Sequence, residues 1–196
     1  MIVKYFDLNK NLNKDINFYL FYGPNLGLIE ETIDNLFKKK FPKYAMHYDE
    51  IDILSNVNSF EDSVFNKSFF DNEKLIIINR STDKILDLIK NILDSEINDI
   101  KIILKSGVLE KKSKLRNLFE KHKKAYAVAF YEDNHQTLNS IVTNYFNVKK
   151  IKISSETTNF LIEKTKGNRI NLKNELDKIG NYSQNKTFIE LDEIKK

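Results

Sequence analysis

The chain has 196 residues, 41% of them hydrophobic, so it can bury one or two packed cores. It has no cysteine, which excludes disulfides, thiolate metal sites and cysteine nucleophiles. The net charge is +4, from 32 basic and 28 acidic residues, and only three basic residues are arginine. The lysines accompany many Asn, Ile, Phe and Tyr residues, all with AT-rich codons, so we interpret their excess as compositional rather than as a signal for reading DNA. No apolar run suits a signal peptide or a membrane span.

Strands and helices alternate over the first two thirds of the sequence. Compact apolar runs predict five strands, at 18–22, 45–48, 75–78, 100–104 and 125–131. Apolar residues at helical spacing predict the helices between them, at 28–40, 59–67, 85–93 and 113–120. Strands joined by helices form a parallel sheet that is covered on both faces. We therefore predict an α/β fold with a five-stranded parallel sheet and flanking helices.

Beyond residue 136 the pattern changes. Apolar residues recur there at helical spacing, which predicts three helices and no further strand. The polar run 132–136 separates the two patterns and is the predicted boundary. We expect a nucleotide-binding-type domain over 1–134 and a small all-α domain over 135–196. The final residues, 189–196, are interpreted as an element cut short.

The turn after the first predicted strand is where a nucleotide-binding fold of this kind holds phosphate. A working phosphate loop needs a nest of backbone amides, a lysine for the outer phosphates and a Ser or Thr hydroxyl for magnesium. This turn contains Gly23, Pro24, Asn25 and Gly27, but Leu28 and Ile29 follow where the lysine and the hydroxyl would stand.

The end of the third predicted strand provides an independent check. An NTPase places acidic residues there, whereas this chain has Asn79 and Arg80. Because both halves of the site are missing, we expect no catalytic residue, no cofactor and no metal. Gly23 and Gly27 are then interpreted as residues that permit a sharp turn and close helix packing.

Other candidates for chemistry are weaker. The three histidines are scattered and lack metal-ligand spacing. The pair Glu30 and Glu31 is placed in the first turn of a predicted helix, where carboxylates interact favourably with the helix dipole. We therefore expect a structural role for this pair rather than acid–base catalysis.

Four segments resemble a known family. They are the loop and helix at 22–31 (YGPNLGLIEE), the strand and basic helix at 103–109 (ILKSGVL) and 112–116 (KSKLR), the strand at 127–131 (AVAFY), and the helix at 167–179 (GNRINLKNELDKI). In this order and spacing they resemble the bacterial DNA polymerase III delta subunit, a component of the clamp loader.

The resemblance implies an AAA+ fold, which is P-loop NTPase-like, with a degenerate nucleotide-binding domain and a helical lid. By this resemblance we expect the chain to contain the first two domains of the family and not its third, collar domain. It also implies a cytoplasmic, non-catalytic subunit of a DNA polymerase holoenzyme, a nucleotidyltransferase, in DNA replication. The implied partners are the sliding clamp (the beta subunit), the ATP-binding and delta-prime subunits of the loader, and primed DNA bound by the assembled complex.

The family contacts the clamp through two adjacent large apolar residues at a helix tip just before the third strand. Phe69 and Phe70 occupy the matching positions, and Lys67 stands where an apolar neighbour is found. Adjacent side chains on a helix point about 100° apart, so at least one of the pair is expected to be exposed. The alternative is that both rings turn inward and close the core ahead of Leu75.

Arg116 has two interpretations. In an AAA+ ring an arginine in this region can reach a neighbour's ATP, but with Lys112 and Lys114 it also forms a solvated helix face, which we prefer. Two alternative functions remain open at this point. One is an NTPase with an atypical phosphate loop, and the other is a degenerate AAA+ adaptor that binds DNA or a replication initiator.

Overall fold

The structure is a computed structural model that describes residues 1–12, 16–39, 45–66, 74–95, 97, 99–183 and 186–195. The chain folds into two compact units, Met1–Tyr131 and Glu132–Lys196. This division falls at the start of the polar run 132–136, three residues before the domain limit of 134 expected from the sequence. Each unit is described separately below.

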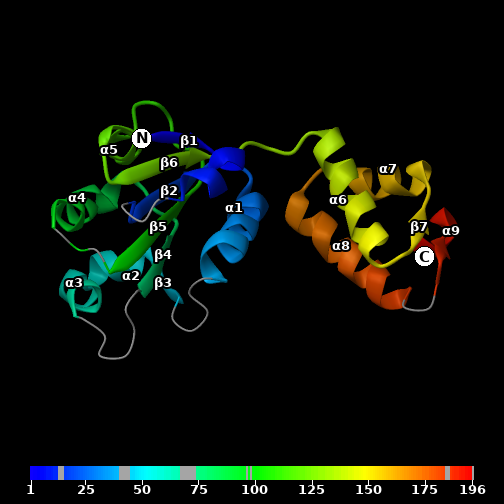
Figure 1. Ribbon diagram of the computed structural model, residues 1–196, viewed down its shortest axis with the longest axis horizontal. Coiled ribbons are helices and arrows are strands. Elements are labelled where there is room, and N and C mark those ends of the chain that lie inside the picture. Colours follow the sequence, from blue (N-terminus) through cyan, green and yellow to red (C-terminus); the bar gives the residue numbers. More distant parts are fainter. Residues whose placement is uncertain are drawn as a thin grey trace. The chain divides into compact units, whose positions relative to one another are not determined.

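The first unit is built on a parallel sheet of six strands in the order β1-β6-β2-β5-β4-β3 (Figure 1). The strands are β1 (Ile2–Lys4), β2 (Phe18–Tyr22), β3 (Ala45–Asp49), β4 (Lys74–Asn79), β5 (Ile100–Ser106) and β6 (Ala125–Ala129). The parallel α/β sheet is as predicted, but five strands were expected. The additional strand is β1, which has three largely exposed residues and pairs with β6. A strand this short at a sheet edge leaves no alternating apolar pattern to detect.

Helices cover both faces of this sheet. They are α1 (Leu26–Ile33), which continues as a π-helix over Asp34–Lys38, α2 (Glu50–Ser55), α3 (Val57–Phe65), α4 (Leu86–Asp94) and α5 (Lys114–Lys121). Short 3-10 turns occupy Tyr5–Asp7, Asn9–Asn11 and Asp83–Ile85. The sequence did not predict α2, because a six-residue helix gives less than two turns of periodicity.

The central strands are buried on both faces, which explains their continuous apolar sequence. In β2, Tyr19 and Phe21 pack with Ile29 of α1 in one core. The alternate residues Phe18, Leu20 and Tyr22 belong to the other core, which contains apolar residues of α3, α4 and α5. Successive side chains of a strand point to opposite faces, so one five-residue run serves two cores.

The second unit consists of α6 (His135–Val148), α7 (Ser155–Lys164), α8 (Arg169–Tyr182) and the short α9 (Leu191–Ile194), packed around one core. It also contains two two-residue strands, β7 (Lys152–Ile153) and β8 (Phe188–Ile189), which pair in parallel. The prediction of a helical domain is confirmed, but the prediction of no further strand is wrong. Two residues are too few to show the alternation of a strand.

The topology places the site. β2 lies between β6 and β5, and the chain leaves it through α1 to reach β3 at the far edge of the sheet. β3, β4 and β5 lie on one side of β2, whereas β6 lies on its other side. In open α/β sheets, ligands bind outside the carboxyl ends of the strands at the point where the strand order reverses in this way. Within the described ranges, no helix is both long and apolar enough to span a membrane.

Candidate functional site

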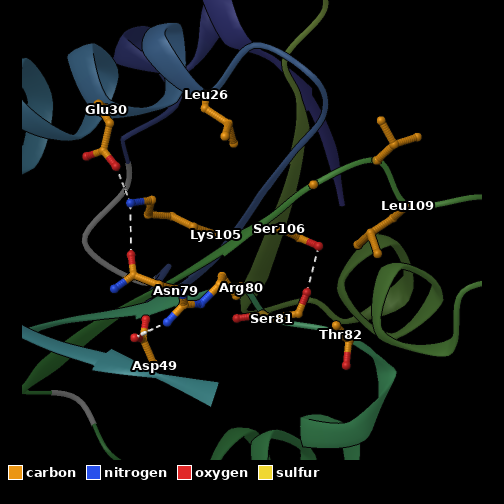
Figure 2. A pocket seen from close by; sticks show the side chains of 12 residues that line it. Leu26, Glu30, Asp49, Asn79, Arg80, Ser81, Thr82, Lys105, Ser106 and Leu109 are labelled. Carbon is orange, nitrogen blue, oxygen red and sulfur yellow. Dashed lines mark hydrogen bonds and ion pairs between the residues drawn. The ribbon is translucent and has the colours of Figure 1, made fainter. Parts of the chain in front are cut away.

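A cleft of about 640 Å³ lies at the carboxyl ends of the strands (Figure 2). Its walls come from the start of α1, from the end of β3, and from the turns that follow β4 and β5. The lining residues are Leu26, Glu30, Asp49, Asn79, Arg80, Ser81, Thr82, Lys105, Ser106, Gly107, Val108 and Leu109.

The turn beside this cleft lacks the side chains of a phosphate loop. Gly23, Pro24 and Asn25 separate β2 from α1, and Leu28 and Ile29 in α1 replace the lysine and hydroxyl of such a loop. Gly23 has φ of +135°, and a Cβ at this position would overlap the carbonyl oxygen of Phe130. Its N–H donates a hydrogen bond to the carbonyl oxygen of Gly107 at 3.0 Å.

Asn25 is the N-cap residue of α1. Its Oδ1 accepts a hydrogen bond from the Leu28 N–H at 3.0 Å, and its Nδ2 donates to the carbonyl oxygen of Tyr131 at 3.0 Å. The Leu26 N–H donates to the carbonyl oxygen of Pro24 at 3.0 Å. Gly27 lies within the first turn of α1. Amides that face the ligand in a phosphate loop are therefore directed here at acceptors of the protein itself.

Lys105 of β5 is one of two cationic residues that line the cleft, with Arg80. Its Nζ forms an ion pair with the carboxylate of Glu30 and a hydrogen bond of 2.9 Å with Oδ1 of Asn79 (Figure 2). The side chain of Lys105 is only 15% exposed, whereas that of Glu30 is 44% exposed. Glu30 lies in the second turn of α1, not the first as predicted, because the helix begins at Leu26. Its partner is therefore a lysine rather than the helix dipole.

Charged side chains at the turn after β4 and at the end of β3 are also bonded to other groups of the protein. Arg80 has a left-handed φ of 57°, and its guanidinium forms an ion pair with the carboxylate of Asp49. The buried Glu50 accepts hydrogen bonds from the main-chain N–H of Thr82 at 2.7 Å and from its hydroxyl. In the described part of the chain, no group of three His, Cys, Asp or Glu residues is arranged to hold a metal ion.

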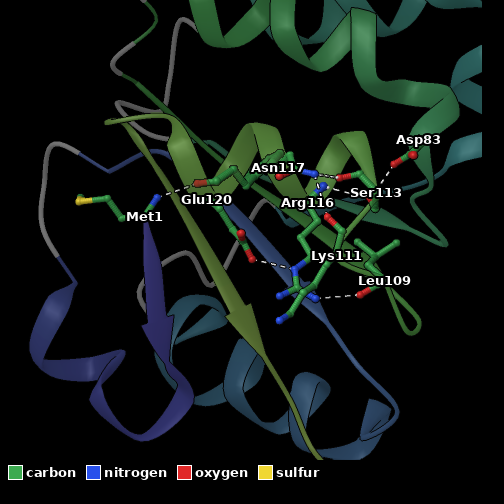
Figure 3. Close-up of polar contacts among 9 residues, drawn as sticks. Met1, Asp83, Leu109, Lys111, Ser113, Arg116, Asn117 and Glu120 are labelled. Atoms are coloured by element: carbon green, nitrogen blue, oxygen red, sulfur yellow. Dashed lines mark hydrogen bonds and ion pairs between the residues drawn. The ribbon is translucent and has the colours of Figure 1, made fainter.

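Arg116 is not part of a solvated face, so that expectation is wrong. Its side chain is 19% exposed and its Nε donates to Glu120 Oε1 at 2.7 Å (Figure 3). One terminal nitrogen donates to the carbonyl oxygen of Leu109 at 3.0 Å, and the guanidinium carbon lies 5.0 Å from the ring centre of Tyr22. The hydrogen bond to Glu120 raises the pKa of Arg116. This arginine ties α5 to β2 and to the loop after β5.

Comparison with known proteins identifies the family. The model of the DNA polymerase III delta subunit matches residues 19–132, more than half of the chain. This chain belongs to the DNA polymerase III delta subunit family. The match runs from β2 to just beyond Phe130, so it covers the degenerate turn, the cleft and α5. A search of curated protein sequences gave no significant match.

Solved structures support the fold of this delta-family chain. The Bacillus subtilis clamp loader delta protein (YqeN) has a TM-score of 0.58 and 19% identity over 97% of this chain, which spans 61% of that protein. Domain III of the Thermotoga maritima replication initiation protein DnaA has a TM-score of 0.57 and 16% identity over 97% of this chain and 86% of that one. The Thermotoga maritima RuvB branch migration motor has a TM-score of 0.59 and 10% identity over 91% of this chain and 59% of that one. The fold is therefore AAA+-like.

The residues predicted to contact the clamp, Lys67, Phe69 and Phe70, lie outside the described residues. The described elements on either side are α3, which ends at Phe65, and β4, which begins at Lys74. The ammonium group of Lys74 donates to the carbonyl oxygens of Ser63 (3.1 Å) and Asn66. The Lys74 side chain therefore links the residue that follows segment 67–73 to Asn66, the residue that precedes it.

Sequence reasoning missed two features of the site. Asn25 is a preferred residue type for a helix N-cap, so its position ahead of Leu28 was a usable signal. The ion pair of Lys105 with Glu30 joins residues 75 positions apart. No local pattern predicts such a pair, because it depends on β5 lying beside β2 in the sheet.

Proposed function

We propose that this chain is the clamp-binding part of a clamp-loader delta subunit, which binds the sliding clamp of DNA polymerase III and opens it for loading onto primed DNA in the cytoplasm. Membership of the delta family is the observation that carries the proposal. The remaining partners would be the ATP-binding subunits and the delta-prime subunit of the loader.

The geometry of the cleft supports a subunit that does not hydrolyse ATP. The turn lacks the lysine and hydroxyl of a phosphate loop, and the N–H groups of Gly23 and Leu28 donate to protein oxygens. The two cations that line the cleft, Lys105 and Arg80, are paired with Glu30 and Asp49. An NTPase would need to break these contacts before it could bind a triphosphate and magnesium.

We propose that Phe69 and Phe70 enter an apolar pocket of the clamp, with Lys67 at the edge of the contact. Each large side chain that becomes fully buried contributes about 1.5–3 kcal/mol. The link from Lys74 to the end of α3 supports this assignment, because it fixes both ends of the segment that carries the two rings. A segment whose two ends are held together loses less conformational entropy when it binds.

Opening requires more than affinity. A ligand shifts an equilibrium only by its differential affinity for the two states, so this chain must bind an open clamp more tightly than a closed one. The test is a titration of the chain into the closed clamp of the same organism and into an interface variant of that clamp which remains an open monomer. We expect tighter binding to the open form, and equal or weaker binding would reject the opening function.

A second titration separates the enzymatic alternative. Calorimetry with ATP and magnesium is expected to give no defined site, whereas a saturable site would favour an NTPase with an atypical loop. Binding of DNA without binding of the clamp would instead favour the AAA+ adaptor.

A further inference from the structure

The connector between the two units is short. The first unit ends at Tyr131, and α6 of the second unit begins at His135, so the connector consists of Glu132, Asp133 and Asn134. A polar segment at a domain boundary is typically exposed and flexible. Here, however, side chains from distant parts of the chain bind both ends of the segment, so its freedom differs from one residue to the next.

The end of the connector on the first unit is held by Asn25. Phe130 is buried in the core, and its N–H donates to the carbonyl oxygen of Tyr22 at 2.8 Å. The carbonyl oxygen of the next residue, Tyr131, accepts a hydrogen bond from Nδ2 of Asn25 at 3.0 Å. Asn25 is itself buried and caps α1 through the Leu28 N–H. The chain therefore leaves the first unit at a point that is tied to the start of α1.

The end of the connector on the second unit is held by Arg169. Nη1 of Arg169 donates to Oδ1 of Asp133 at 2.6 Å, and the two side chains are only 9% and 4% exposed. Removing one partner of a buried ion pair leaves an uncompensated buried charge, so such a pair is not easily broken. Asn134 follows as the N-cap of α6, and its Oδ1 accepts from the Thr137 N–H at 2.8 Å. From Asp133 onward the chain is thus fixed to the second unit.

Arg169 extends from a tight turn. It is the first residue of α8, and the turn from α7 contains two residues in the left-handed region, Lys166 with φ of 52° and Gly167 with φ of 67°. The Gly167 N–H donates to the carbonyl oxygen of Ile162 at 3.0 Å. The guanidinium that binds the connector is therefore carried by a backbone that is itself held in place.

We propose that Asn25 and Arg169 are positioning residues that confine the hinge between the two units to Glu132. Glu132 is exposed, and among the described residues it has no hydrogen bond or ion pair. Hinges are a few loop residues whose φ and ψ absorb the motion of the parts that they join. In a nucleotide-binding member of the fold, the start of α1 faces phosphate. In this chain a side chain at that position holds the connector, so the hinge is defined without a ligand. This inference does not depend on the proposed clamp contact.

The test measures the distance distribution between two spin labels, one in each unit. The chain has no cysteine, so Lys90→Cys in α4 and Val148→Cys in α6, both exposed positions, provide unique labelling sites. Arg169→Gln and Asn25→Asp should each broaden the distribution, because each releases one end of the connector. Glu132→Pro should narrow it, because proline fixes its own φ and restricts the residue before it. Cleavage after Glu132 by a glutamate-specific protease should be at least about 10-fold faster in Arg169→Gln, since cleavage follows the population of the opened segment.

Lys164→Gln is the control, because it removes an ion pair with Glu175 in the second unit but no contact of the connector. It should keep the parent's distribution and cleavage rate. If Arg169→Gln does not fold, Asp133→Asn provides a milder change, since it removes the charge but keeps an acceptor oxygen, and it should also broaden the distribution. The proposal is wrong if the variant that folds lowers the unfolding temperature but keeps the parent's distribution, because the ion pair would then only stabilise the second unit. It is also wrong if Glu132→Pro leaves the distribution unchanged or if the control broadens it equally.

Discussion

The main-chain nitrogen of Gly23 lies 3.0 Å from the carbonyl oxygen of Gly107 and donates a hydrogen bond to it. This bond joins the turn after β2 to the turn after β5, directly beside the cleft. In a nucleotide-binding member of the fold, the first of these turns would wrap around phosphate. In this chain the Gly23 N–H is bonded to the protein instead, so the turn is held in place without a nucleotide.

Gly23→Ala should destabilise the first unit. The φ of +135° is strained for any residue with a Cβ, and the added atom would overlap the carbonyl group of Phe130. We expect a loss of about 3 kcal/mol or more in the free energy of unfolding, measured by urea denaturation. Gly107→Ala is the matched control, because a Cβ there would contact nothing within 4 Å. Equal effects of the two substitutions would contradict this account of the turn.

Asn25 should stabilise the turn through two separable contacts. Asn25→Ala removes the acceptor for the Leu28 N–H and the donor to the Tyr131 carbonyl, and we expect a cost of about 1–2 kcal/mol. Asn25→Asp keeps the helix-capping oxygen but cannot donate to Tyr131, so its stability should lie between those of the parent and Asn25→Ala. Thermal unfolding of the three proteins measures this order. An Ala variant as stable as the parent would show that the cap contributes nothing.

Gly180 allows α8 to approach α6 in the second unit. A Cβ at this position would overlap the hydroxyl of Tyr145 and would lie 2.7 Å from Cε of Lys149. Gly180→Ala should therefore lower stability by less than about 1 kcal/mol, instead of raising it as alanine normally does in a helix, because the ends of these two side chains must shift. Adding Tyr145→Phe removes the clashing oxygen, so the double variant should lose less than the sum of the single losses in a denaturation cycle. A Gly180→Ala chain more stable than the parent would contradict the packing described here.

Asp83 should make stability depend on pH. The hydrogen bond from Ser113 lowers the pKa of Asp83 below its usual value of 3.8, with further contributions from the N–H groups of Leu115 and Lys114. A carboxyl group with a lowered pKa stabilises the fold above that usual value, and this stabilisation is lost as the pH falls through the lowered pKa.

The matching variant is Asp83→Asn, which should cost about 1 kcal/mol at neutral pH because the capping contacts to α5 are weakened. The difference in stability between parent and variant should shrink as the pH is lowered below 3.8. Urea denaturation at neutral and acid pH measures it. A difference that stays constant with pH would contradict a role for the ionised carboxylate.

Much of the fold could be predicted from the sequence because the central strands are buried on both faces. Runs such as Phe18–Tyr22 and Leu75–Ile78 are continuous apolar segments, which predict buried strands. The elements that escaped prediction are short. β1, β7 and β8 are held by pairing with a distant strand, as in the pairing of Ile2 with Ala127.

The site was predictable in one respect. The absence of lysine and hydroxyl at Leu28 and Ile29 is a local fact of the sequence, and it already excluded an ordinary phosphate loop. The pairing of Lys105 with Glu30 in the wall of the cleft was not predictable, because it depends on the order of strands in the sheet. The same reason explains the error for Arg116, whose position beside Tyr22 follows from where α5 packs.

The most direct test of the central claim is the affinity of this chain for the sliding clamp of the same organism, with and without Phe69→Ala and Phe70→Ala. Two buried phenylalanine rings at about 1.5–3 kcal/mol each predict that the double variant binds at least about 100-fold more weakly. Phe6→Ala is the control, because it removes an exposed ring elsewhere (60% exposed) and should leave the affinity unchanged. All three proteins should unfold at the same temperature. A double variant that binds the clamp as tightly as the parent, or that unfolds at a clearly lower temperature, would contradict the account.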